Sequence, residues 1–237
     1  MNPNPARSTI LPEALEPPMN SRAAVLSGLL VLSSACATES HRVVATEPVA
    51  SHGTPYSGPQ TPLAVGKVAN ASPYMRGIFT SGDQLGGQAK TILKTHLAQS
   101  GRFDVVDRDN LEEIAFESQT TGVSQELVGA RYVITGEVTE FGRKETGDSQ
   151  LFGILGRGRK QLAFSKVSLN VIDVTTSRIV YSVQGAGEYE LGSREVLGTG
   201  GTQGYDSTLN GKVLNLSITD AVNKLVQDLE SGKAPLK

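Results

Sequence analysis

The feature that most constrains the fold is a pair of alternating segments joined by a short turn in the second half of the chain. Residues 166–174 alternate apolar side chains with Ser168 and Asn170, and residues 178–184 return as a strand after a Thr-Thr-Ser turn. A segment that alternates in this way has one apolar face, which another layer must cover. The pattern therefore predicts an antiparallel hairpin within a sheet that has a buried face.

Two helical patterns can supply the covering layer. In the C-terminal region, apolar residues recur at the spacing of one helix face: Leu214, Ile218, Ala221, Val222, Leu225, Val226 and Leu229. Residues 85–97 show a second such pattern, and Gly101 stands where a left-handed C-cap belongs. Asp109 and Glu112 resemble a capping box, which predicts that a third helix begins there and runs through Leu111.

Three further segments have the composition of strands. They span residues 63–69, 103–107 and 131–141. Together with the hairpin and the helices, they give the predicted order β-α-β-α-β-β-β-α. This order predicts an α+β fold in which helices cover a mixed β-sheet.

Two long glycine-rich segments flank the hairpin. Residues 142–161 hold five glycines and residues 185–204 hold seven. Connections of this length are usually either functional or disordered, and both lie at the same end of the predicted strands. A membrane strand needs about 9–11 residues, so each segment is long enough for a β-hairpin that enters a membrane.

Charge and histidine spacing narrow the classes of function. Lys and Arg number 22 and Asp and Glu number 24, so the near-neutral chain has no electrostatic reason to bind nucleic acid. The histidines are His41, His52 and His96, and none belongs to a cluster with the spacing of metal ligands. We therefore expect no nucleic-acid partner, no metal and no cofactor.

A glycine-rich stretch at residues 153–160 invites comparison with a phosphate-binding loop. Such a loop needs Lys and then Ser or Thr directly after its last glycine, whereas Arg159 and Lys160 stand there. The chain also shows no Ser-His-Asp order, nucleophile elbow or isolated carboxylate pair. We expect that this protein is not an enzyme.

The N-terminal region has the pattern of an export signal that ends at the only cysteine. Residues 23–35 are uncharged and mostly apolar, Arg22 precedes them and Cys36 follows them. The run is too short for a transmembrane helix, which needs about 20 residues. The acidic residues and prolines before Met19 do not suit a signal. We therefore expect a signal peptide within residues 1–35, with Met19 as the translation start.

The residues before Cys36 resemble the signal box of bacterial lipoproteins, although Ser33 stands where such boxes usually carry Leu. The resemblance implies that the thiol of Cys36 carries a diacylglycerol, and that several acyl chains, such as palmitate, make the attachment to a membrane permanent. No Asp follows the cysteine, which indicates the outer rather than the inner membrane. Residues 36–61 are predicted to form a lipidated, flexible tether and residues 62–237 the folded domain.

Three stretches of the folded domain resemble the CsgG family of curli and holdfast-related secretion lipoproteins. They are Phe103–Leu111, Gly129–Phe141 and Val167–Val183. The resemblance implies a homo-oligomeric ring on the periplasmic side of the outer membrane, lipid-anchored, that exports unfolded curli-like or adhesin subunits. It also implies that each subunit adds two β-hairpins, at the glycine-rich segments, to a shared transmembrane β-barrel.

The pore of this family narrows at a loop after the first strand, which is lined by an aromatic pair with an amide beside the second aromatic. Tyr74 and Phe79 match the aromatic pair, and Ile78 stands in place of the amide. The resemblance implies that these three residues form a constriction, which the isoleucine makes more apolar. Alternatively, the two aromatic side chains fix the loop to the core.

A second interpretation of the whole chain stays open, because a fold does not determine a function. In this interpretation the protein is a periplasmic lipoprotein adaptor that never enters the membrane and binds an envelope protein or the cell-wall machinery. The two interpretations differ in whether the glycine-rich segments form membrane hairpins.

Overall fold

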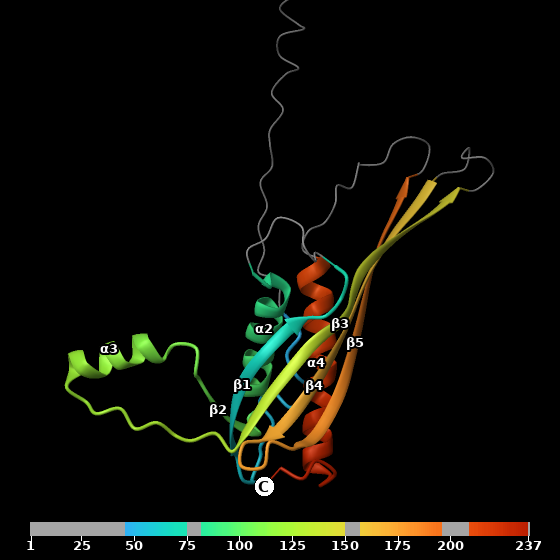
Figure 1. The fold of residues 1–237 in the computed structure, drawn as a ribbon. Coiled ribbons are helices and arrows are strands. Elements are labelled where there is room, and N and C mark those ends of the chain that lie inside the picture. The colour runs from blue at the N-terminus through green and yellow to red at the C-terminus, as the bar shows by residue number, and fades with distance from the viewer. Residues whose placement is uncertain (1–45, 75–81, 150–156, 196–208, 237) are drawn as a thin grey trace, which may run out of the picture. The chain divides into compact units, whose positions relative to one another are not determined.

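A mixed five-stranded sheet forms the centre of the fold (Figure 1). The computed structural model describes residues 46–74, 82–149, 157–195 and 209–236. The strands lie in the order β2-β1-β3-β4-β5, with β1 parallel to both of its neighbours and with β3, β4 and β5 antiparallel. Their bounds are Thr61–Asn70 for β1, Phe103–Val106 for β2, Tyr132–Ser149 for β3, Arg157–Asp173 for β4 and Ile179–Glu195 for β5.

Two helices cover one face of this sheet (Figure 1). They are α2, Gln84–Ser100, and α4, Leu209–Glu230. Their apolar stripes meet alternate residues of the strands in one core. Its most deeply buried members include Leu63, Leu93, Leu97, Ile134, Leu169, Leu214, Ile218 and Leu225. The α+β architecture and the order of the elements are thus as the sequence predicts.

The central hairpin has the predicted turn. Ile172 pairs with Ile179 across it. The carboxylate of Asp173 accepts hydrogen bonds from the backbone N–H and the hydroxyl of Thr176, at 2.8 and 2.9 Å. Such local hydrogen bonds are the usual way in which Asp stabilises a turn.

The three antiparallel strands are longer than the sequence pattern predicts. β3 and β4 stay paired as far as Ser149 and Arg157, and β5 continues to Glu195. Hydrophobic alternation marks the part of a strand that packs on a helix, whereas backbone pairing requires only a neighbouring strand. Alternation therefore predicts the packed parts of the strands, whereas the extensions lie in the glycine-rich segments, where only segment length and the family resemblance predict strands.

Residues 46–60 lie against the body, which differs from the predicted flexible tether that runs up to the first strand. Val49 is 1% exposed. The guanidinium of Arg102 donates to the carbonyl of Thr54 at 3.0 Å and lies 4.9 Å from the ring centre of Tyr56. One apolar anchor and a few backbone contacts produce no periodicity, so no sequence pattern reveals this packing.

The helix α3, Leu111–Thr121, departs from two predictions. None of its residues is buried, so it stands away from the sheet instead of covering it (Figure 1). The predicted capping box is wrong, because the N-cap residue is Asn110 and its side chain makes no capping hydrogen bond. Asp109 instead accepts hydrogen bonds from Lys90 and Lys94 of α2, one at each of its carboxylate oxygens.

Candidate functional site

β3, β4 and β5 continue past the helices as a ribbon of three strands (Figure 1). The ribbon comprises residues 142–149, 157–164 and 188–195. β1 is the other neighbour of β3 in the sheet, and it pairs with β3 no further than Val138. Among the residues that the structure describes, both edges of the ribbon therefore lack a partner strand.

Four side chains meet at the base of the ribbon, and we name them the base cluster: Tyr74, Phe141, Arg143 and Asn210. The ring centres of Tyr74 and Phe141 are 4.8 Å apart, with their planes inclined by 56°. Asn210 Nδ2 donates to the hydroxyl of Tyr74 at 2.9 Å. Arg143 Nε donates to Asn210 Oδ1, also at 2.9 Å. Asn210, at the start of α4, thus connects the loop after β1 to the ribbon.

The same end of the sheet holds both flanks of the segment 75–81. Before this segment, Asn70 Nδ2 donates to the carbonyl of Tyr74 at 2.8 Å. After it, the carboxylate of Asp83 accepts the N–H of Gly86 at 2.8 Å as the N-cap of α2. Asp83 also accepts the N–H of Asn70 at 2.6 Å. Both flanks are therefore attached to the end of β1.

Of the residues predicted to form a constriction, Tyr74 belongs to the described part of the chain. Its half-buried ring packs against the core. Ile78, Phe79 and the predicted lipidation residue Cys36 lie outside the described residues.

The inner part of the ribbon carries aromatic and charged side chains. Lys144 Nζ lies 5.5 Å from the ring centre of Phe164, and Lys212 Nζ lies 5.1 Å from that of Tyr189.

Within the described ranges, no three His, Cys, Asp or Glu side chains are placed to hold a metal ion. In the same ranges, no helix has both the length and the hydropathy to cross a membrane.

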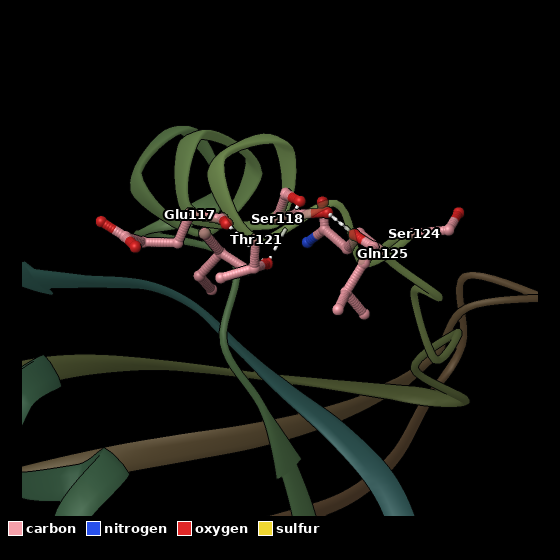
Figure 2. A pocket seen from close by; sticks show the side chains of 7 residues that line it. Glu117, Ser118, Thr121, Ser124 and Gln125 are labelled. Atoms are coloured by element: carbon pink, nitrogen blue, oxygen red, sulfur yellow. Dashed lines mark hydrogen bonds between the residues drawn. The ribbon is translucent and has the colours of Figure 1, made fainter.

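A second candidate site lies on the arm, which we define as residues 111–128, namely α3 and the segment after it. The arm has a hollow of about 400 Å³, lined by Ile114, Glu117, Ser118, Thr121, Val123, Ser124 and Gln125. Figure 2 shows these side chains from close by. Gly122 ends α3 in the left-handed conformation, with φ of 68°. The N–H of Val123 then donates to the carbonyl of Ser118 at 3.1 Å. The hollow therefore results from the way in which α3 ends.

Ion pairs with α2 determine where the arm leaves the body. Lys94 Nζ lies 2.8 Å from an oxygen of Asp107 and 3.3 Å from an oxygen of Asp109. The hydrogen bond from Lys94 holds the pKa of Asp107 well below its usual range, and the same bond raises the pKa of Lys94. At the other end of the arm, Arg108 donates to the carbonyl of Val128. The arm is thus held at both of its ends.

Sequence patterns missed Arg143 and Asn210, which are 67 residues apart. A polar pair at this separation leaves no periodic signal. The arm did leave a periodic signal, because the apolar residues Phe116, Val123 and Leu127 recur at the spacing of one helix face, although α3 itself ends at Thr121.

The fold and its sites define a class of protein, a small α+β body from which a strand ribbon and a helical arm project. A family model described as "Curli production assembly/transport component CsgG" matches residues 54–234. The chain is also 56% identical over 213 residues to a protein of Neisseria meningitidis serogroup B named "Putative lipoprotein", which covers 90% of this chain and 96% of the relative. This chain therefore belongs to the CsgG family, which confirms the resemblance in its sequence.

Solved structures with a similar fold are more distant. The PelC dodecamer from Paraburkholderia phytofirmans is 16% identical, covers 71% of this chain and 93% of the PelC chain, and has a TM-score of 0.32. Lipoprotein GNA1162 from Neisseria meningitidis is 14% identical, covers 70% of this chain and 99% of that chain, and has a TM-score of 0.33. At these scores, neither structure bears on the assembly of this chain.

Proposed function

We propose that this chain is a lipoprotein subunit of a ring-shaped channel in the outer membrane. Lipid on Cys36 anchors it on the periplasmic side, and the channel exports unfolded protein chains of the curli-like or adhesin type. Membership of the CsgG family and the description of the 56%-identical relative as a lipoprotein support this proposal. The protein works without a catalytic centre or a cofactor, because it provides a path and selects what enters it.

The observation that carries the proposal is the open ribbon. β5 is the last strand of the sheet, and the opposite edge of the ribbon, on β3, has no described strand beside it beyond Val138. Open edges expose N–H and C=O groups that pair readily with another strand. In a membrane, strands satisfy all of these groups only in a closed barrel. In a ring of copies, the ribbon of one copy would lie beside the ribbon of the next. The second glycine-rich segment, residues 185–204, would then join the two edges and close the barrel.

The loop after β1 supports a constriction at the base of this barrel. The base cluster fixes Tyr74 against Phe141, and so fixes the start of the loop. From the family resemblance we assign Tyr74, Ile78 and Phe79 to this constriction, with the base cluster holding Tyr74 in place. A narrow apolar ring of this kind admits extended chains and excludes folded ones.

The test is electron microscopy and planar-bilayer conductance on the intact chain extracted in detergent. We expect rings that conduct. In a variant, an Asn-Gly turn replaces residues 146–160 and joins Glu145 to Gln161, which pair across β3 and β4. This variant keeps the packed sheet but shortens the ribbon, so conductance should be lost. A second variant, Cys36→Ser, should no longer fractionate with membranes.

One observation favours a second function. The strand pairing places Lys144, Leu162 and Glu190 on one face of the ribbon, with Glu188 beside Phe164 on the same face. Lys144, Glu188 and Glu190 are exposed, whereas membrane strands carry an apolar band about 25 Å tall on their lipid face. This charge favours a periplasmic lipoprotein adaptor whose ribbon binds an envelope protein or the cell-wall machinery. A monomer that never conducts, and that leaves the membrane on Cys36→Ser, would establish the adaptor.

A further inference from the structure

The arm carries most of the exposed large apolar side chains of the described residues. Those on the arm are Ile114, Phe116, Val123, Leu127 and Val128, with exposed fractions of 41%, 66%, 66%, 60% and 52%. Scattered exposed apolar residues are ordinary, but Ile114 and Val123 line one hollow, and apolar side chains that gather in this way mark an interaction surface. The body of the same chain does not cover them, because α3 buries no residue and these side chains are exposed.

The arm is also strongly acidic. Glu112, Glu113, Glu117 and Glu126 lie on it, and residues 109–130 contain neither Lys nor Arg. Glu117 lines the hollow itself. A surface that complements the arm must therefore combine apolar side chains with positive charge.

The turn between β4 and β5 offers such a surface, which we name the turn patch: Arg131, Val174, Arg178 and Ile179. Val174 and Ile179 are 51% and 60% exposed, and in the described ranges they complete the set of exposed large apolar residues. Arg131 lies beside them, since its carbonyl accepts the N–H of Val174 at 3.1 Å. Asp173, in the same turn, is bound to Thr176. With two arginines against one carboxylate, the turn patch is positive.

We propose that the arm of one copy of this chain docks on the turn patch of a second copy. Apolar side chains of the turn patch enter the hollow between Ile114 and Val123, and the glutamates of the arm face the two arginines. This inference deepens the proposed function and rests on it for the ring. Because arm and turn patch are different surfaces, their contact is head-to-tail, and contacts of that kind generate a ring when the rotation between successive copies closes.

Disulfide cross-linking between differently tagged chains tests the contact. The intact chain is extracted in detergent as two variants, Phe116→Cys with one tag and Ile179→Cys with another, which are mixed under mild oxidation. A third variant, Lys233→Cys, replaces an exposed residue outside the turn patch and serves as the matched control partner. We expect the tags to be linked about tenfold more with Ile179→Cys than with Lys233→Cys. The unsubstituted chain accounts for any link through Cys36.

Charge reversal gives an independent test on the same cysteine pair. Glu113→Arg with Glu117→Arg on the arm, or Arg178→Glu on the turn patch, should each lower cross-linking about tenfold through like-charge repulsion. A reversed arm mixed with a reversed turn patch should restore it. The control Lys233→Glu should leave the yield unchanged.

Three results would overturn the proposal. One is a cross-link within a chain that carries both cysteines, without a link between tags, because the arm then covers its own turn. The others are equal yields with the Lys233→Cys control and no response to charge reversal. Conductance is measured separately. Linked copies that do not conduct would refute the channel but support the arm contact. Conducting rings without the link would support the channel but refute the arm contact.

Discussion

At the residue scale, single polar side chains set positions that apolar packing leaves open. Asn210 binds the hydroxyl of Tyr74 through its amide nitrogen and Arg143 through its oxygen. Tyr74 matches the first aromatic of the family's constriction, yet its ring is held by Phe141 and the core. A substitution of Tyr74 therefore acts on the base of the ribbon as well as on the proposed constriction.

The ion pair of Lys94 and Asp107 makes stability depend on pH. Asp107→Asn should lower the free energy of unfolding by roughly 1 kcal/mol near neutral pH, because water screens a partly exposed pair. The folded-state pKa of Asp107 lies below its unfolded value. The carboxylate therefore stabilises the fold above about pH 4, and this contribution disappears as the pH falls through the folded-state pKa.

Urea denaturation of the Asp107→Asn variant and the unsubstituted chain, near neutral pH and near pH 3, measures this effect. The difference between the two chains should shrink at the lower pH. Asp104→Asn, which changes an exposed carboxylate on the neighbouring strand β2, is the matched control and should show little difference at either pH. An equal difference for Asp107→Asn at both pH values would contradict the assignment.

At the element scale, α4 packs closely on β5 because the strand has glycine at the contact. A Cβ atom on Gly185 would lie 2.0 Å from the carbonyl oxygen of Ser217 and 2.5 Å from the backbone nitrogen of Ala221. Glycine in a strand commonly marks such a close backbone approach. The contact brings the apolar stripe of the helix onto the sheet.

Gly185→Ala should therefore destabilise the chain by about 1–3 kcal/mol, since α4 must shift to admit the methyl group. The matched control is Gly87→Ala on α2, where an added Cβ would meet nothing within 4 Å. This control should stabilise the helix by about 0.5–1 kcal/mol. Urea denaturation measures both changes, and a loss of equal size in the two variants would refute the close approach as the cause.

At the scale of the whole molecule, Arg102 joins parts of the chain that are far apart in sequence. Its Nη1 donates to the carbonyl of Thr54 at 3.0 Å, and its Nε donates to Glu230, at the end of α4, at 2.8 Å. The residue is 5% exposed. The segment before β1 is thereby attached to the C-terminal end of the body.

Arg102→Ala should lower the free energy of unfolding by about 2–3 kcal/mol, because buried carbonyl groups lose their donor. It should also expose residues 46–60 to cleavage under native conditions. Urea denaturation and limited proteolysis measure the two effects. Lys233→Ala, at an exposed site near the same end, should change neither; a stable Arg102→Ala variant with a protected N-terminal segment would contradict this role.

The sequence by itself determined the elements whose apolar residues recur at a regular spacing. Val167, Leu169 and Val171 alternate because they meet one core from one face of a strand, and the apolar residues of α4 recur because its successive turns meet that same core. The left-handed C-cap at Gly101 was predictable for a similar reason, since it requires only local geometry. The family, too, was evident in the sequence, from stretches that lie on and beside the strands of the sheet.

Only the tertiary structure decided the length of the ribbon, the position of α3 away from the sheet, and the contacts of Asn210 and Arg102. Strand pairing beyond the helices uses backbone N–H and C=O groups, and every residue but proline carries both. The capping prediction at Asp109 was wrong because its carboxylate accepts hydrogen bonds from Lys90 and Lys94 of α2. Contacts between distant segments depend on one side chain at each end, and such contacts have no period that a sequence can show.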